Sequence, residues 1–258
     1  MYKGTKLRPF NMFACLAVIA VNALAQIHPL GGLATGEISA MFPVQITPAP
    51  YAFSIWGLIY ALLLGYAILQ LIPGQREQDE VRAIGPWFVV SCFFNISWLF
   101  LWQCLFISSS LFVMLGLLLS LAAIYWNTRY KGWSSNRWIR FLVQMPFSLY
   151  FGWITAASLA NAAVFLYAHQ WDGLGLPETF WTVIGLLIAG LLSLLIGCRF
   201  HDPFYMLAIV WAMSAIGTAN RDYPAIFCMA WVSAGLLLIY ALLLLYSLLT
   251  RKHKIKRR

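Results

Sequence analysis

The sequence predicts an all-α polytopic membrane protein with about eight transmembrane helices. Of its residues, 62% are hydrophobic and only 10% are charged, and the mean hydropathy is +0.79. Apolar runs recur that are long enough to cross about 30 Å of hydrocarbon at about 1.5 Å per residue. The sequence does not show the alternating segments of roughly ten residues that are typical of a membrane β-barrel.

Eight apolar runs follow one another along the chain. The predicted spans are residues 9–26, 51–72, 86–106, 111–127, 138–167, 180–199, 203–219 and 224–249. The first run also has the pattern of a cleavable signal peptide, whose removal would leave seven spans. Because the stretch from Phe10 to Ala25 is long for a signal core, we expect it to remain as a helix of the bundle.

The basic residues predict the orientation of these spans. With eight spans, sixteen of the seventeen Lys and Arg residues fall on one side of the membrane, and only Arg221 falls on the other. The positive-inside rule places the basic side, with both chain ends, in the cytoplasm. The basic tail is expected to set topology and to contact membrane lipid rather than nucleic acid. The expected location is the plasma membrane, the inner membrane of a bacterium.

The predicted spans lack the ionisable residues on which several classes of membrane protein depend. Every Asp and Glu falls in a loop or at a helix edge, and no Lys or Arg lies mid-span. A retinal protein needs a buried lysine, a proton-coupled pump usually needs intramembrane carboxylates, and a metal-dependent hydrolase needs clustered ligands. The sequence therefore favours a protein that is not an enzyme and requires neither a cofactor nor a metal.

Aromatic and amide side chains are the chemistry that the spans do contain. They recur at helical spacing on one face of each of three spans. These faces are Phe53, Trp56 and Tyr60 in the second span, Asn95, Trp98 and Trp102 in the third, and Trp153, Ala157 and Asn161 in the fifth. One interpretation is a shared ligand pocket near the outer leaflet, and the other is ordinary packing of buried amides and rings.

The segment 27–50 is the longest predicted external connection. It is rich in Gly and Pro and has no basic residue. It either folds over the opening of the pocket or is an unstructured connector.

Small residues recur every four positions in the sixth span, at Ala189, Ser193 and Gly197. Such a face allows close helix association. It suits a partner in a membrane complex, but packing within the chain or against lipid is the preferred interpretation.

Three motifs in series resemble one family. The stretch Thr47–Tyr60 has a Pro-rich entry followed by Phe53, Trp56 and Tyr60, and Asn95 and Trp98 stand three apart. A third segment from Pro146 has Trp153 and Asn161 eight residues apart. In order and interval these residues resemble helices 2, 3 and 5 of the TspO/MBR family, the tryptophan-rich sensory or translocator proteins. The resemblance covers about residues 9–167.

This resemblance implies a five-helix bundle with an aromatic pocket under the loop between helices 1 and 2. Family members bind porphyrins and other planar amphipathic ligands and commonly form dimers. The implied ligand-binding residues are Phe53, Trp56, Tyr60, Asn95, Trp98, Trp153 and Asn161. A second pocket tryptophan of some members is Ala162 here, which puts porphyrin degradation by paired tryptophans in doubt.

The resemblance also implies two parts of the chain. Residues 1–167 form the TspO-like module, and residues 168–258 add three helices and the basic tail. The predicted function is a membrane sensor or carrier for a planar hydrophobic small molecule, with a porphyrin or another tetrapyrrole as the first candidate, in a protein that forms a homodimer. The alternative is an uncoupled or partner-dependent transporter of a small amphipathic molecule.

Overall fold

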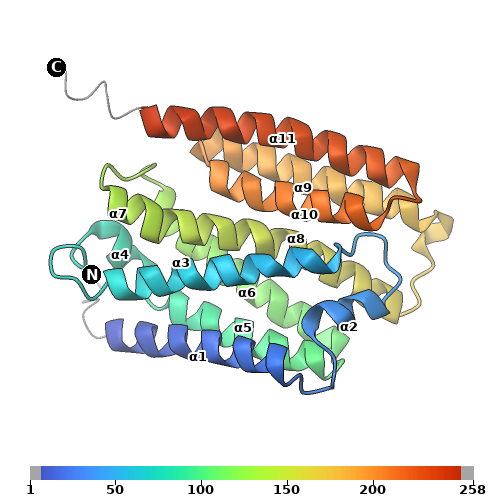
Figure 1. The fold of residues 1–258 in the computed structure, drawn as a ribbon, viewed down its shortest axis with the longest axis horizontal. Coiled ribbons are helices and arrows are strands. Elements are labelled where there is room, and N and C mark those ends of the chain that lie inside the picture. The colour runs from blue at the N-terminus through green and yellow to red at the C-terminus, as the bar shows by residue number, and fades with distance from the viewer. Residues whose placement is uncertain (1–6, 251–258) are drawn as a thin grey trace.

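The computed structural model describes residues 7–250 as a bundle of long helices that run alternately in opposite directions (Figure 1). Its helices are α1 (Arg8–Ile27), α2 (Thr35–Met41), η1 (Pro50–Ser54), α3 (Ile55–Leu69), α4 (Asp79–Ile84), α5 (Trp87–Gln103), α6 (Ile107–Arg129), α7 (Arg137–Ile139), η2 (Arg140–Gln144), α8 (Met145–Ala168), η3 (Gly173–Gly175), α9 (Glu178–Phe200), α10 (Pro203–Ala219) and α11 (Pro224–Thr250). The described residues contain no strand.

The eight predicted spans are confirmed as helices. Six helical segments are long and apolar enough to cross a membrane, and α5 and α10 are apolar helices of 17 residues each. The fifth span is interrupted near its start, where a π-helical turn precedes Pro146. Proline has no N–H for the regular helical ladder, and a wider turn accommodates that loss.

Basic residues gather at the end of the bundle where α1 begins and α11 ends, which we call the basic end. Its described members are Arg8, Arg76, Arg82, Arg129, Lys131, Arg137, Arg140 and Arg199. Arg221 follows α10 at the opposite end. The one-sided distribution is thus present in the fold, and the assignment of the basic end to the cytoplasm stays a prediction. Lys3, Lys6 and the basic tail lie outside the described residues.

Glu77 ties three arginines together on the surface of the basic end. Its carboxylate forms ion pairs with Arg8, Arg76 and Arg82. The hydrogen bond from Arg82 is the main reason why the pKa of Glu77 lies below its ordinary value of 4.5. These contacts fasten the start of α1 to the segment between α3 and α4.

A lowered carboxyl pKa contributes stability above the ordinary pKa, and this contribution is lost as the pH falls through the lowered value. Glu77→Gln is therefore expected to lower the melting temperature slightly at pH 7, because the group is exposed. The difference from the wild type should vanish in strongly acidic buffer, as thermal melts at several pH values will show. A difference that grows towards acid pH would contradict the assignment.

Helix α8 is the centre of the bundle. It packs against α3, α6 and α10. At Gly152 a Cβ atom would lie 2.7 Å from the carbonyl oxygen of Tyr205, so only glycine allows α10 to approach this closely. The large hydrophobic core of α1, α3, α5, α6 and α8 accordingly includes Phe204, Ala208 and Ala212 of α10.

The small-residue face of the sixth span packs within the chain. Ala189 and Ser193 are buried, and a Cβ at Gly197 would lie 2.5 Å from the sulfur of Met206. Helix α9 packs chiefly against α10 and α11. The intramolecular interpretation of this face is therefore confirmed.

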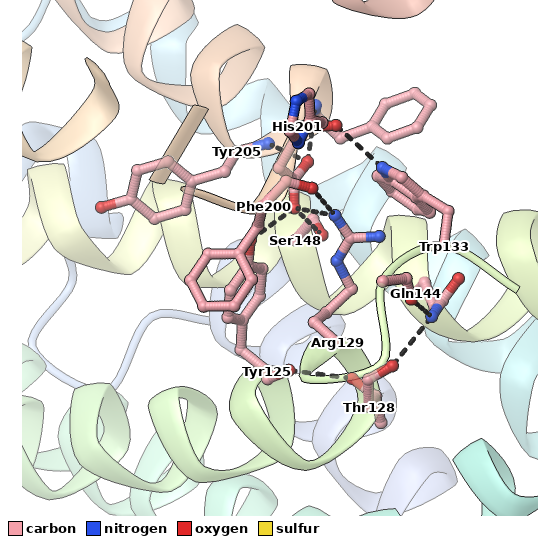
Figure 2. A network of polar contacts seen from close by, with 12 residues as sticks. Tyr125, Thr128, Arg129, Trp133, Gln144, Ser148, Phe200, His201 and Tyr205 are labelled. Atoms are coloured by element: carbon pink, nitrogen blue, oxygen red, sulfur yellow. Dashed lines mark hydrogen bonds and ion pairs between the residues drawn. The ribbon is translucent and has the colours of Figure 1, made fainter. Parts of the chain in front are cut away.

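A fully buried ion pair joins the end of α6 to the turn between α9 and α10 (Figure 2). Arg129, the last residue of α6, and Asp202 both have side chains with 0% exposure, and their nearest charged atoms are 3.6 Å apart. The Arg129 guanidinium donates to the Phe200 carbonyl at 2.8 Å and lies 3.3 Å from the ring centroid of Trp133.

Asp202 is the acceptor at the centre of this network. It accepts hydrogen bonds from the hydroxyls of Tyr125 (2.8 Å) and Ser148 (2.6 Å). It also caps α10 by accepting from the backbone N–H groups of Phe204 and Tyr205. The position of Asp202 between two spans agrees with the sequence prediction, but its complete burial was not foreseen.

Candidate ligand-binding site

The aromatic faces predicted in the second, third and fifth spans meet around one hollow, which we call the aromatic cavity. Five of the seven predicted residues line it: Phe53, Trp56, Trp98, Trp153 and Asn161. They come from η1, α3, α5 and α8, whose apolar interior faces turn the rings towards one another. The other lining residues are Ser39, Ile46, Pro48, Trp102, Ala156, Ala157, Ala160, Val164, Ala212 and Ile216.

Perpendicular rings form one wall of the cavity. Trp153 meets Trp56 with 6.3 Å between ring centroids and an interplanar angle of 86°, and it meets Phe53 at 6.0 Å and 83°. On another side Trp98 and Trp102 stack at 5.6 Å and 21°. Edge-to-face and offset-stacked pairs are favourable ring arrangements, so these walls hold their shape. Alanines at positions 156, 157 and 160 leave space beside the rings.

Three polar groups distinguish the cavity from a purely apolar core. The Trp98 indole N–H donates to the Asn161 side-chain oxygen at 2.9 Å, and the Asn161 amide donates to Ser110 at 3.1 Å. Trp153 is 2% exposed, and its buried indole nitrogen has no hydrogen-bond partner in the part of the chain that the structure describes. A buried donor without an acceptor is costly and uncommon in proteins. An acceptor on a bound molecule would satisfy it.

The remaining predicted residues, Tyr60 and Asn95, support the cavity wall and do not line it. Tyr60 stacks on Trp56 at 5.3 Å and 19°. Asn95 is buried, and its side-chain oxygen accepts from Asn22 at 2.9 Å and from Tyr60 at 3.4 Å. Its amide donates to the hydroxyl of Tyr150 at 2.7 Å. Asn95 therefore links α1, α3 and α8 next to Trp56.

The aromatic cavity is narrow and lies between two wider spaces. Its volume is about 40 Å³, which suits a few water molecules. The α1–α3 groove, which shares Phe53, Trp56 and Trp98 with the cavity, has a volume of about 670 Å³. The α8–α9 groove, which shares only Ile46 with it, has a volume of about 460 Å³. A planar ring ligand requires movement of the side chains between the cavity and a groove.

The segment 27–50 is ordered over the cavity, so its interpretation as an unstructured connector is wrong. It contains α2, and the Thr35 carbonyl accepts from the Trp102 indole at 3.2 Å. Ser39, Ile46 and Pro48 of this segment line the cavity. It therefore closes the cavity at the end opposite the basic end.

Helix α10 contributes to the site, which the sequence did not reveal. Its residues Ala212 and Ile216 line the cavity. The Trp211 indole donates to the Ala52 carbonyl at 2.9 Å, and the Ala215 carbonyl accepts from the Ala49 backbone N–H at 3.1 Å. The segment that leads into α3 is thus held in place by α10, which lies outside residues 1–167. The only available signal, small and apolar residues in a predicted span, is shared by all the spans.

Across residues 7–250, no three His, Cys, Asp or Glu side chains lie close enough together to hold a metal ion. The site offers aromatic rings, small residues and a few amide and indole groups, which are the components of a pocket for an apolar molecule with few polar atoms.

The fold and this cavity define a multi-pass α-helical membrane protein with an aromatic interior site. A family model described as TSPO-like protein matches residues 8–243, and the chain belongs to this family. The match includes α9 and α10 and most of α11, so it extends well beyond the first five spans. No curated protein and no solved structure matches the chain. Membership of this family makes the chain a membrane protein of the sensor or transporter type.

Proposed function

We propose that this protein is a sensor or carrier that binds a planar hydrophobic ligand, with a tetrapyrrole such as a porphyrin as the first candidate. The observation that carries the proposal is that Trp153, whose buried indole N–H has no hydrogen-bond partner among residues 7–250, lines a cavity together with Trp56, Phe53 and Trp98. A planar ring would stack on these side chains, and a carbonyl or carboxylate oxygen on it would accept from Trp153. Burial of such a face is compatible with micromolar affinity, roughly −8 kcal/mol.

A planar ring ligand would need more room than the aromatic cavity has in the ligand-free protein. Trp56 lies between the aromatic cavity and the α1–α3 groove and lines both. Phe53 and Trp98 also line both spaces, and movement of these rings would join the two spaces. The joined space has the size of a small-molecule site, for which several hundred Å³ is usual.

The test is titration of the purified protein in nanodiscs with protoporphyrin IX, followed by quenching of tryptophan fluorescence. Trp56→Ala should raise the Kd roughly tenfold, because a stacking partner is lost. Trp153→Phe should also weaken binding, while the melting temperature stays the same or rises, because an unsatisfied buried donor has been removed. Trp87→Phe is the matched control, since Trp87 lies at the start of α5 and lines neither the cavity nor a groove. Equal Kd values for Trp56→Ala and the wild type would refute the proposal.

The packing below the cavity favours a binding protein over a transporter. Towards the basic end the interior is filled by Tyr66, Phe88 and Phe147, which are all 0% exposed. Their ring centroids are 5.0 to 5.8 Å apart in perpendicular pairs. A path across the membrane would have to break this cluster. Ligand-dependent flux in proteoliposomes would support the transporter instead.

The other functional expectations are part of the same proposal. We propose that the protein is not an enzyme, needs no cofactor for its fold, resides in the plasma membrane and forms a homodimer. Cross-linking in native membranes tests the last of these.

A further inference from the structure

The α8–α9 groove is a second large space near the aromatic cavity. Ala162 and Tyr167 of α8 line one side of it, and Gly185 and Ile188 of α9 line the other. Trp171 and Trp181, whose ring centroids are 4.9 Å apart, belong to its lining near the connection between the two helices. The groove between α8 and α9 is open because α9 packs chiefly against α10 and α11 and makes few contacts with α8.

The groove is accessible from the surface that faces lipid in a membrane. Tyr167 is 50% exposed and Ile188 is 42% exposed, and both are in helices apolar enough to span the bilayer. Small residues at 162 and 185 keep the space between the helices open. The groove thus opens towards the surface from which an apolar molecule dissolved in the bilayer would approach.

Ile46 is the one residue that lines both the α8–α9 groove and the aromatic cavity. Its side chain lies against Gly185, where an added Cβ would be 2.4 Å from the Ile46 Cδ1 atom. The neighbouring Gln45 fixes this position. Its backbone carbonyl accepts from Asn220 at 2.7 Å, and its side-chain oxygen accepts from Thr179 at 3.0 Å.

The aromatic cavity is separated from the two grooves by different side chains, and these must move before a ligand can pass. On the α1–α3 side Trp56 contacts the rings of Tyr60, Tyr150 and Trp153, and its displacement breaks all three contacts. On the α8–α9 side the shared side chain is a single aliphatic residue. Rotation of Ile46 therefore breaks no ring–ring contact, whereas rotation of Trp56 breaks three.

We propose that the α8–α9 groove is the lateral entrance through which an uncharged planar apolar ligand passes from the bilayer to the aromatic cavity, with Ile46 as the side chain it displaces. The proposal rests on the proposed function, because it assigns a route to the same site. The ligand class follows from charge: Asp172 and Glu178 belong to the lining of the groove, and none of the Lys and Arg residues between positions 7 and 250 does. Carboxylates at the entrance disfavour an anionic ligand.

The test measures association and dissociation rates by stopped-flow quenching in nanodiscs, with the dimethyl ester of protoporphyrin IX as an uncharged probe. Ala162→Trp fills the groove and should slow both rates roughly tenfold, equivalent to about 1.4 kcal/mol in the barrier. The Kd should stay unchanged, because the end states are the same. Ile46→Ala should speed up both rates. Ala61→Trp is the matched control, since Ala61 lines the α1–α3 groove.

The outcomes separate this proposal from the proposed function. Slowing by Ala162→Trp with acceleration by Ile46→Ala supports the entrance. Slowing by Ala61→Trp with no effect of Ala162→Trp places the entrance between α1 and α3 and overturns the proposal, while the binding function stands. If Ala162→Trp does not fold, unchanged rates in Ile46→Ala alone overturn it. Absence of Trp56-dependent binding of the ester and of protoporphyrin IX by the wild type refutes the proposed function itself.

Discussion

Replacement of Arg129 by alanine is expected to lower the free energy of unfolding by about 3–5 kcal/mol. The Asp202 carboxylate would remain at 0% exposure and lose its only ion-pair partner among the described residues. It would keep the hydrogen bonds from Tyr125 and Ser148, so the expected loss comes from the uncompensated charge. The change in the free energy of unfolding is measured by denaturation in mixed micelles, followed by circular dichroism.

Lys131→Ala is the matched control for this prediction. Lys131 follows Arg129 by two residues and pairs with Asp79 at 3.3 Å, but the two side chains are 63% and 77% exposed. Exposed pairs contribute about 0–1 kcal/mol, so this variant should unfold almost like the wild type. If Arg129→Ala and Lys131→Ala have equal effects, the buried ion pair does not hold the turn between α9 and α10.

A double variant, Arg129→Met with Asp202→Asn, separates the charge from the packing. It removes both charges together and leaves side chains of similar size. We expect it to recover much of the stability lost in Arg129→Ala. The amide at position 202 still accepts from the N–H groups that begin α10, and this preserves the cap.

The sequence predicts local features of this protein well because they depend on neighbouring residues. The spans follow from apolar runs, and the faces of Trp56, Trp98 and Trp153 follow from helical spacing. Their convergence on one cavity corresponds to one of the two interpretations that the spacing left open. Ordering of the segment 27–50 was one of two open interpretations, because its Gly and Pro content suits a folded loop and a flexible one equally.

The features that the sequence did not predict depend on contacts between distant segments. Arg129 and Asp202 are 73 positions apart, and each alone resembles a loop charge at a helix end. Their burial depends on how α9 and α10 pack against α6 and α8. In the same way Ala212 and Ile216 have no distinguishing residue type, and only the close approach of α10 to Gly152 brings them to the cavity.

Asn95→Leu is expected to lower the free energy of unfolding by about 3 kcal/mol, because three polar groups each lose a hydrogen bond to Asn95 at once and an unpaired buried group costs about 1–3 kcal/mol. These groups are the Asn22 amide and the hydroxyls of Tyr60 and Tyr150. Leucine has a similar volume, so cavity formation contributes little. The same unfolding measurement applies, with Asn127→Leu as the control, since Asn127 is half-buried and donates a single bond of 3.3 Å.

The consequence for the site follows from the rings that Asn95 holds. Tyr60 stacks on Trp56, and Tyr150 meets Trp56 with 5.6 Å between ring centroids. When their hydroxyls lose Asn95, both rings gain freedom and Trp56 loses its fixed position. The Kd for protoporphyrin IX should therefore rise roughly tenfold, about 1.4 kcal/mol, although position 95 does not line the cavity. A variant that is destabilised but binds with the wild-type Kd would show that Trp56 is positioned by its ring contacts alone.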